Sequence, residues 1–408
     1  MAHNTSRPLT FLCVSTFFKG VDFIKACKAA GNTVYLVTAK QLEHEAWPRE
    51  SIDEIFYVEN DANTLQNFEI MEQGMAYIQR TRPIDRIVAL DDFDVEKAAF
   101  LRESFRIPGM GQTTARHFRD KLAMRMKAAE AGINVPPFTA LFSDNSINEF
   151  IRDVPAPWVV KPRGEASATG IKKVNNGMDL WKVINDLGEE RHNYLVEQFK
   201  PGAVYHVDSL TVDGKPKFSR VSQYLNTPFE VAHGGGVFLS SVSTFGGDDD
   251  KALQKMNREV LKAFGMQFSA SHTEFIKSHE DGQFYFLETS SRVGGAHLAE
   301  MVEASSGINL WAEWAKIETA MAKGETYKLP KVRKDYAGIL VSLSRFQHPD
   351  MSGFDDSEIV WKMQKEYHVG MIVRDKKRAR VLDLLQGYAK RVFDGFHAAV
   401  PAPEKSVH

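Results

Sequence analysis

Residues 272–292 read His-Thr-Glu-Phe-Ile-Lys-Ser-His-Glu-Asp-Gly-Gln-Phe-Tyr-Phe-Leu-Glu-Thr-Ser-Ser-Arg. Two stretches typical of strands flank a Glu-Asp-Gly turn at residues 280–282, which predicts a β-hairpin with a three-residue loop and a left-handed glycine. Counting outward from that loop places Glu274 directly opposite Glu288. The two carboxylates are then expected on one face of a sheet, with Cβ atoms about 5 Å apart.

Two like charges placed opposite each other destabilise a sheet unless a cation lies between them. Carboxylate oxygens with few imidazoles or thiols nearby are suited to Mg²⁺, which keeps positions open for phosphate oxygens. The hairpin therefore predicts a magnesium site formed by Glu274 and Glu288, with Mn²⁺ as a second candidate ion. Two solvated edge carboxylates, or a slipped register, are the alternatives.

A second informative stretch, residues 158–173, reads Trp-Val-Val-Lys-Pro-Arg-Gly-Glu-Ala-Ser-Ala-Thr-Gly-Ile-Lys-Lys. Lys161 ends an apolar strand, and a loop of mostly small residues follows between Gly164 and Gly170. Such a loop lets backbone N–H groups approach phosphate oxygens, and the lysine adds a positive charge. It is not a Walker A loop, because no Gly-Lys-Ser/Thr opens a helix. A flexible hairpin tip is the alternative.

A third stretch, residues 194–199, reads Tyr-Leu-Val-Glu-Gln-Phe and is followed by Pro201-Gly202. The pattern predicts a strand that ends in an acidic and a polar residue. The edge of such a strand could offer backbone groups to a purine. An ordinary amphipathic edge strand is the alternative interpretation.

Two glycine-rich segments are candidate substrate contacts. Residues 233–236 read His-Gly-Gly-Gly, a loop whose backbone could approach a ligand closely. Residues 292–297 lead into a helix, whose free N–H groups favour an anion such as a carboxylate. Loop histidines without a role are the alternative. The residues concerned are His233, Gly234, Gly235, Gly294, Gly295 and His297.

Length and composition limit the class of protein. A chain of 408 residues is expected to form two or three domains. A net charge of −2 with 43% hydrophobic residues indicates neither disorder nor a strongly basic surface for nucleic acid. Two cysteines are too few for a disulfide framework, and the first apolar run is too short for a signal peptide or a membrane span. We therefore expect a cytoplasmic protein without nucleic-acid or membrane partners.

The beginning of the chain predicts a parallel α/β unit. Residues 10–15 and 33–38 are strand-like and flank a helix-like stretch at residues 21–30, which is a β-α-β pattern. The first ~115 residues are therefore expected to form a small α/β domain. No Gly-x-Gly-x-x-Gly follows the first strand, so a dinucleotide-binding fold is not supported.

The order of the motifs carries more information than any one of them. The series runs Arg119-Asp120-Lys121, Gly-Ile-Asn-Val-Pro at 132–136, Val-Lys-Pro at 160–162, Val-Glu-Gln-Phe at 196–199, Thr-Glu-Phe at 273–275, and Leu287-Glu288 with Arg292 four residues later. Over roughly residues 10–320, this series resembles the ATP-grasp superfamily. It looks most like the carboxylate–amine ligase branch near the L-amino-acid ligases, whose overall layout is shared with biotin carboxylase.

The resemblance implies a multidomain fold of the α/β and α+β classes, with a pre-ATP-grasp α/β domain at the N-terminus. The expected units are the N-terminal domain at residues 1–117, a lid at 118–199, a large subdomain with the metal site at 200–330, and a C-terminal α+β subdomain and tail at 331–408. ATP would lie between the lid and the large subdomain.

The resemblance also implies a role for each matching residue. Lys121 and Lys161 would contact the ATP phosphates, under a lid that includes Gly164, Ser167, Ala168 and Thr169. Glu197, Gln198 and Phe199 would form the hinge that holds adenine, and Glu274 and Glu288 would bind Mg²⁺. Two positions depart from the family pattern. Ser290 replaces the usual Asn metal ligand, and no acid follows the hinge glycine, which leaves Asp208 or Tyr205 as candidates for ribose.

The expected function is ATP-dependent joining of a small carboxylate to an amine through an acyl phosphate, with release of ADP and phosphate. Lys161 and Arg292 would be the catalytic residues, with Arg292 binding the substrate carboxylate or the developing oxyanion; a salt bridge to Glu300 or Glu303 is its alternative role. Free amino acids are the first hypothesis for the substrates, and a homodimer is one option. Two rival functions remain: carboxylation through carboxyphosphate, as in biotin carboxylase, and non-catalytic ATP binding.

Overall fold

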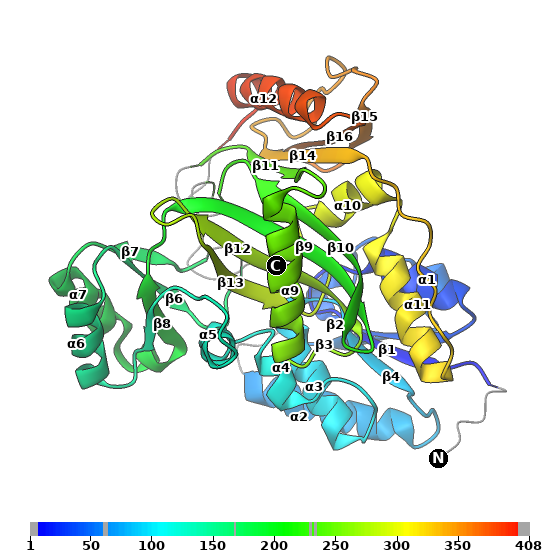
Figure 1. Cartoon of the computed structure of the whole chain (residues 1–408). Coiled ribbons are helices and arrows are strands. Elements are labelled where there is room, and N and C mark those ends of the chain that lie inside the picture. The colour runs from blue at the N-terminus through cyan, green and yellow to red at the C-terminus, as the bar shows by residue number, and fades with distance from the viewer. Residues whose placement is uncertain (1–6, 60–63, 167–168, 228–230, 232–234, 399–408) are drawn as a thin grey trace.

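The computed structural model of the chain describes residues 7–59, 64–166, 169–227, 231 and 235–398, and its strands form three sheets (Figure 1). The first sheet belongs to the N-terminal part of the chain, the second to a small unit at one side, and the third runs through the middle of the molecule. Among the helices in these ranges, none is long and apolar enough to cross a membrane.

The N-terminal sheet is parallel, in the order β3-β2-β1-β4, as the β-α-β pattern predicts. Alternate residues of β1 enter two cores, with Phe11 and Cys13 on the α1 side and Leu12 and Val14 on the side of α2 and α3. Burial on both faces explains why this strand is apolar throughout. Both cysteines are free and buried. The elements are β1 (Thr10–Val14), α1 (Val21–Ala29), β2 (Thr33–Ala39), η1 (Lys40–Leu42), η2 (Arg49–Ser51), β3 (Glu54–Val58), α2 (Thr64–Gln79), β4 (Arg86–Ala89), η3 (Asp92–Asp94), α3 (Val95–Ser104) and α4 (Gln112–Arg116).

The second sheet is antiparallel, in the order β5-β8-β6-β7. Helices α6 and α7 cover one face of it, and Val160 and Val196 pack there against Ile147 and Leu180. This unit occupies the region expected to form the lid. Its elements, with the helix that precedes them, are α5 (Lys121–Glu130), β5 (Phe138–Ala140), α6 (Asp144–Asp153), β6 (Trp158–Pro162), β7 (Lys172–Val174), α7 (Gly177–Leu187), η4 (Gly188–Asn193) and β8 (Tyr194–Gln198).

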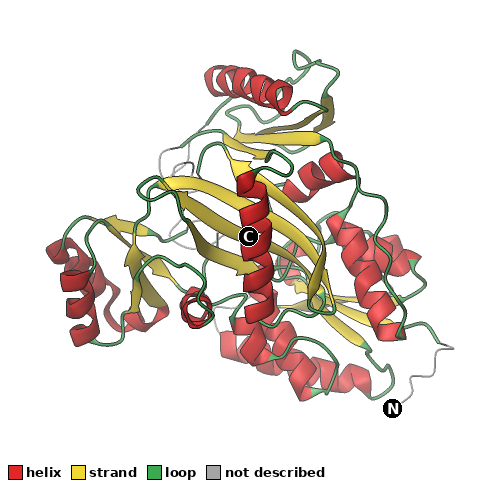
Figure 2. Cartoon of the chain, viewed as in Figure 1, coloured by secondary structure: helices red, strands yellow, loops and turns green. Residues whose placement is uncertain are grey.

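The central sheet has eight antiparallel strands, in the order β13-β12-β9-β10-β11-β14-β16-β15. Helix α9 packs on one face against Tyr205, Val207 and Phe275, and α10 packs on the other face with Val204 and Ile276. Figure 2 shows α9 crossing in front of the strands. The elements of this part are β9 (Gly202–Val212), β10 (Lys215–Tyr224), β11 (Phe238–Val242), α9 (Asp248–Ala263), β12 (Ser269–Ser278), β13 (Phe284–Ser290), α10 (Leu298–Ser306) and α11 (Leu310–Lys323).

The C-terminal strands continue this sheet and do not form a sheet of their own. Strand β14 pairs with β11 on one side and with β16 on the other, and α12 packs over them. The expected boundary at residue 330 therefore divides the chain into segments that share one sheet. The elements are β14 (Tyr336–Leu343), β15 (Ile359–Lys362), β16 (His368–Asp375) and α12 (Arg378–Gly395).

The predicted hairpin is formed by β12 and β13, but its loop differs from the prediction. The Ser278 N–H donates to the Gln283 oxygen at 2.9 Å, so four residues form the loop and the expected three-residue loop is wrong. Further along, Leu287 is an extra residue in β13, because the residues on either side of it pair with adjacent residues of β12. This bulge shifts the register by one residue and restores the predicted pair Glu274–Glu288.

The fold predicts opposite effects of the same substitution at two glycines. A Cβ at Gly202 would lie 2.3 Å from the backbone oxygen of Lys277 in the paired strand. Gly202→Ala should therefore lower the free energy of unfolding by about 1–3 kcal/mol through overpacking. At Gly74, exposed in α2, a Cβ meets nothing within 4 Å, so Gly74→Ala should raise it by about 0.5–1 kcal/mol. Urea denaturation of both variants measures this, and a stabilised Gly202→Ala variant would contradict the close strand pairing.

Candidate active site

The predicted metal ligands lie on the face of the central sheet that is opposite to α9. Antiparallel pairing places Glu274 of β12 across from Glu288 of β13 and from His206 of β9. Directly opposed residues share a face, so these three side chains lie on the same side of the sheet. Ser290 follows Glu288 by two residues and pairs with His272, which puts it on this face as well.

Each of the two glutamates already has a partner. The Tyr224 hydroxyl donates to Glu274 Oε1 at 2.7 Å, and Lys121 Nζ lies 2.9 Å from Glu288 Oε2. Burial alone would raise the pKa of Glu274, but the hydrogen bonds from His272 and Tyr224 lower it, so this carboxylate is ionised at neutral pH. Glu274 and Glu288 therefore present negative charge on the face of the central sheet opposite to α9, which we call the site face.

A buried cluster of three charges connects the lid to this hairpin. Glu197 accepts from Lys161 Nζ at 2.5 Å through one oxygen and from Arg125 Nε at 2.8 Å through the other. Arg125 also donates through Nη1 to the backbone oxygen of Leu287, the bulged residue. Arg125 is 0% exposed, and its two partners in the cluster are also buried. Burial lowers the pKa of Lys161 to about 8, and the neighbouring Arg125 charge adds to the shift.

Arg125 is absent from the sequence-based prediction, although its position holds a clue. It follows Lys121 by four residues on α5, and residues at that spacing share one face of a helix. The cluster also changes the interpretation of Glu197. Both oxygens of its carboxylate are taken by Lys161 and Arg125, so the side chain does not stand free to contact adenine. Gln198 and Phe199 follow it at the end of β8 and remain candidates for the hinge.

The glycine-bounded loop lies beside Lys121. The side-chain Nζ of Lys121 donates to the backbone oxygen of Glu165 at 2.5 Å, and the backbone N–H of Lys121 donates to the backbone oxygen of Arg163 at 2.9 Å. Gly164 lies between those two residues, and Thr169 is buried at the other end of the loop. Ser167 and Ala168, which were predicted to contact phosphate, lie outside the described residues.

Arg292 is held by the N-terminal domain. Its Nε donates to Asp92 Oδ2 at 2.9 Å, its Nη2 reaches the same oxygen, and its Nη1 donates to the Val293 oxygen at 2.7 Å. Among the described residues, Arg292 forms no ion pair with Glu300 or Glu303, which are the alternative partners expected from the sequence. Burial alone would raise the pKa of Asp92, but the charges of Arg292 and Arg119 keep it well below its usual range.

The sequence carries a signal that would have found Asp92. Asp91, Asp92 and Asp94 directly follow β4, and ligand sites of parallel sheets lie beyond the carboxyl ends of their strands. The ion pair with Arg292 thus brings that end of the N-terminal sheet to the active site.

Asp208 is not available to ribose. Its two oxygens accept from His206 Nδ1 at 2.7 Å and His272 Nδ1 at 2.8 Å, and its side chain is 0% exposed. Burial alone would lower the pKa of His272, but the charges of Asp208 and Glu274 raise it to about 10. Tyr205 is not available either, because it packs in the α9 core and its hydroxyl donates to Asp249. We therefore withdraw both ribose assignments.

The glycine-rich segments are only partly described. His233 and Gly234 lie outside the described residues, and Gly235 has a φ of 65°. Gly294 packs on the His272–Asp208 hydrogen bond, whereas a Cβ at Gly295 would meet nothing within 4 Å. His297 precedes α10 with a φ of 59°, and its ring lies 4.8 Å from that of Trp361, between centroids.

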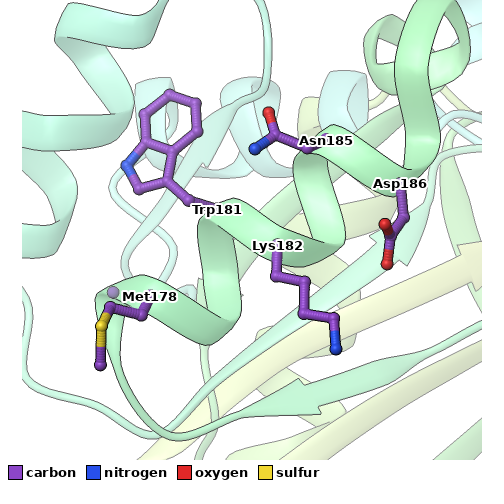
Figure 3. A pocket seen from close by; sticks show the side chains of 6 residues that line it. Met178, Trp181, Lys182, Asn185 and Asp186 are labelled. Atoms are coloured by element: carbon purple, nitrogen blue, oxygen red, sulfur yellow. The ribbon is translucent and has the colours of Figure 1, made fainter.

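Two hollows of the molecule lie elsewhere. Figure 3 shows one on α7, lined by Met178, Trp181, Lys182, Asn185 and Asp186. A second, of about 350 Å³, lies between the N-terminal domain and the central sheet and is lined by Arg86, Arg102, Glu318 and both polar and apolar residues. Neither is lined by a residue of the predicted site.

Comparisons with known proteins show which proteins this chain resembles. The chain is 28% identical over 270 residues to an L-arginine-specific L-amino acid ligase of Bacillus subtilis, covering 62% of each chain. It therefore spans less than two thirds of that relative's length. An L-amino acid ligase structure from Bacillus licheniformis superposes with a TM-score of 0.74 at 17% identity, over 96% of this chain and 99% of that one. A biotin carboxylase structure from Campylobacter jejuni gives 0.67 at 14% identity, over 94% and 91%. No family model matches the chain.

These likenesses show that the chain has the ATP-grasp fold, which confirms the expected fold class. Two of these similar proteins are L-amino acid ligases, the kind of enzyme that the order of the motifs resembles.

The buried cluster predicts that Arg125→Met is strongly destabilising. Glu197 would stay buried with one of its two cations removed, and the Leu287 oxygen would lose its donor, so the free energy of unfolding should fall by about 3–5 kcal/mol. Urea denaturation without nucleotide measures the loss. Arg152→Met is the matched control, because Arg152 pairs with Asp153 on the surface and its loss should change little. Equal stability of the two variants would contradict the role of the cluster.

Proposed function

We propose that this protein is an ATP-dependent ligase that joins a small carboxylate to an amine through an acyl phosphate. The observation that carries the proposal is the pair Glu274–Glu288 on the site face, with Lys121 against Glu288 and the buried Lys161 in the adjoining lid. The likeness to two L-amino acid ligases supports it, and makes amino acids the proposed substrates.

The two glutamates fit a divalent cation. Tyr224 takes Oε1 of Glu274, and Lys121 takes Oε2 of Glu288. Among the described residues, no hydrogen bond or ion pair occupies the other oxygen of either side chain, so one oxygen of each is available. Carboxylate oxygens suit Mg²⁺, with Mn²⁺ as an alternative, and Ser290 could add a weaker or water-mediated contact. Glu274 and Glu288 would hold the ion, whose positive charge would help to neutralise the phosphates of ATP.

The proposed reaction has two steps. The substrate carboxylate attacks the γ-phosphorus of ATP, which forms a C–O–P bond and releases ADP, while Lys121 and Lys161 balance the phosphate charge. An ammonium has three N–H donors, so Lys161 would contact phosphate while it keeps its hydrogen bond to Glu197. The amine then attacks the acyl carbon, loses a proton, and displaces phosphate as the amide bond forms. Arg292 keeps N–H groups beyond those that bind Asp92, and these would stabilise the oxyanion.

A second candidate function is carboxylation through carboxyphosphate, which the likeness to a biotin carboxylase favours. These 408 residues contain no Met-Lys-Met biotin-attachment motif, and carboxylation would need a biotin carrier in addition to them. A non-catalytic nucleotide-binding role is less consistent with the presence of both lysines, both glutamates and Arg292. We further propose a cytoplasmic location, where both cysteines would stay reduced, and a homodimer as the form to test.

ADP release with pairs of amino acids, followed by mass spectrometry of the products, tests the proposal. We expect ADP release that depends on a carboxylic acid and an amine, with a product whose mass equals the two substrates minus water. Release that depends on bicarbonate instead would favour carboxylation. Release that depends on no added acid would contradict both reactions.

The metal assignment predicts that Glu288→Gln reduces turnover by about 100- to 1,000-fold, the usual cost of one lost transition-state stabiliser. The amide keeps the shape of the side chain but loses the charge that faces the cation. Glu280→Gln is the control, because Glu280 lies exposed at the tip of the same hairpin and should not affect turnover. Near-normal ADP release by Glu288→Gln at saturating Mg²⁺ would refute the assignment.

The low pKa of Lys161 predicts a pH dependence. Lys161 loses its proton as the pH rises through about 8, and the neutral amine attracts phosphate less strongly than the ammonium. The value of kcat/KM for ATP, which reports the free enzyme, should therefore fall above that pH. Lys161→Arg keeps its charge at all accessible pH values, so any activity that it retains should lack this decline. A flat wild-type profile between about pH 7 and pH 9.5 would exclude the ammonium of Lys161 from ATP binding.

A further inference from the structure

Behind Glu274, buried polar side chains form a continuous hydrogen-bonded row. Its members come from the neighbouring strands β12, β9, β10 and β11, and all of them except Glu274 are less than 9% exposed. The contacts are Tyr224 Oη to Glu274 Oε1 at 2.7 Å, His272 Nε2 to Glu274 Oε1 at 3.5 Å, His272 Nδ1 to Asp208 Oδ1 at 2.8 Å, Asp208 Oδ2 to His206 Nδ1 at 2.7 Å, and His206 Nε2 to Ser240 Oγ at 2.8 Å.

Strand register explains why these residues meet. His206 pairs with Glu274, and Asp208 pairs with His272, so the four side chains alternate between β9 and β12 on one face. Tyr224 lies at the end of β10 and pairs with Ser240 of β11, which is also a member of the row. The members of the row therefore lie at neighbouring positions of one sheet face and have one another as partners.

The backbone after the hairpin packs directly on the row. A Cβ at Gly294 would lie 2.9 Å from His272 Nδ1 and 3.0 Å from Asp208 Oδ1, the two atoms of one hydrogen bond. Only a glycine lets the chain pass so close without moving that pair. The close fit holds the His272 ring between Gly294 and Glu274.

A second metal ion is a weaker explanation of the cluster. Ligand atoms of His206, Asp208 and His272 lie within 4.8 Å of one another. However, the two Nδ1 atoms bind different oxygens of Asp208 at 2.7 and 2.8 Å, so each imidazole already uses its facing nitrogen. A central carboxylate between two imidazoles orients the rings, as second-shell groups do around metal sites.

We propose that Tyr224 and His272 are positioning residues for Glu274: they engage Oε1 and turn Oε2 toward the cation. This inference rests on the proposed function, because it needs Glu274 to be a metal ligand. Of the two oxygens of Glu274, Oε2 would then be the one free to hold the ion. Asp208, His206 and Gly294 contribute by fixing the His272 ring, without touching the metal site themselves.

The proposal predicts that Tyr224 affects the binding of the cation and does not affect the binding of the substrates. Loss of an outer-shell partner typically weakens metal affinity by about 10- to 100-fold. Tyr224→Phe keeps the ring, which packs 4.8 Å from His206 and 5.6 Å from Phe238 between centroids, so the fold should survive. Its hydroxyl contacts Glu274, which is why the effect should appear in the metal dependence.

The experiment measures ADP release against Mg²⁺ concentration for the wild type, Tyr224→Phe, Tyr205→Phe and Glu274→Gln. Tyr205→Phe is the matched control, because Tyr205 neighbours His206 in sequence but faces the α9 core and donates to Asp249. We expect the half-saturating Mg²⁺ concentration of Tyr224→Phe to rise by about 10-fold or more, with its KM for the acid unchanged and its turnover largely restored at high Mg²⁺. Tyr205→Phe should behave as the wild type.

Direct binding of Mn²⁺ with a non-hydrolysable ATP analogue, followed by electron paramagnetic resonance, gives a readout that does not depend on turnover. Weaker Mn²⁺ binding by Tyr224→Phe and not by Tyr205→Phe supports the proposal. If Tyr224→Phe binds and uses the metal as the wild type does, while Glu274→Gln binds it weakly, the positioning role is overturned and the ligase proposal stays intact. If Glu274→Gln also binds and uses the metal normally, the metal site itself is refuted.

Discussion

The structure depends on one buried set of charges, formed by Arg125, Glu197 and Lys161. A charge taken out of water is tolerated only while its partners remain, so these three side chains cannot separate without a large cost. They belong to α5, β8 and β6, and Arg125 also holds the backbone of the β13 bulge. The lid is thereby tied to the hairpin that carries the predicted metal ligands. Helix α5 contributes a second time through Lys121, one turn earlier, which reaches Glu288.

The two faces of the central sheet differ because successive side chains of a strand point to opposite sides. The face under α9 carries an apolar core, and the opposite face carries Glu274, Glu288 and the polar row, next to apolar contacts with α10. Because the side-chain period of a strand is two, a shift of one residue would exchange the faces. The bulge at Leu287 is therefore decisive, since it sets the register that brings the two glutamates together.

The N-terminal domain also belongs to the site. Asp92, at the carboxyl end of its parallel sheet, binds Arg292 beyond the metal hairpin. A fold of this class hosts several reactions, as the likeness to both ligases and a biotin carboxylase illustrates, so function has to be argued from side chains. The ligase proposal accordingly stands on the carboxylate pair and the lysines, and the fold alone would not distinguish it from carboxylation.

The sequence by itself determined the features that local patterns control. These are the parallel β-α-β start, strand β8, strand β6 with Lys161 next to its last residue, and the pairing of Glu274 with Glu288. That pairing was predicted through a wrong loop length, which the bulge at Leu287 offsets. Only the tertiary structure decided the partners of Arg125, Arg292 and Asp208. Asp92 and Arg292 are 200 residues apart in the chain. The sequence around Asp208 predicts only an acidic residue in a strand, and its histidine partners follow from the pairing of β9 with β12. Local periodicity shows which way a side chain faces, but the partner that it meets is set by which segments fold against each other.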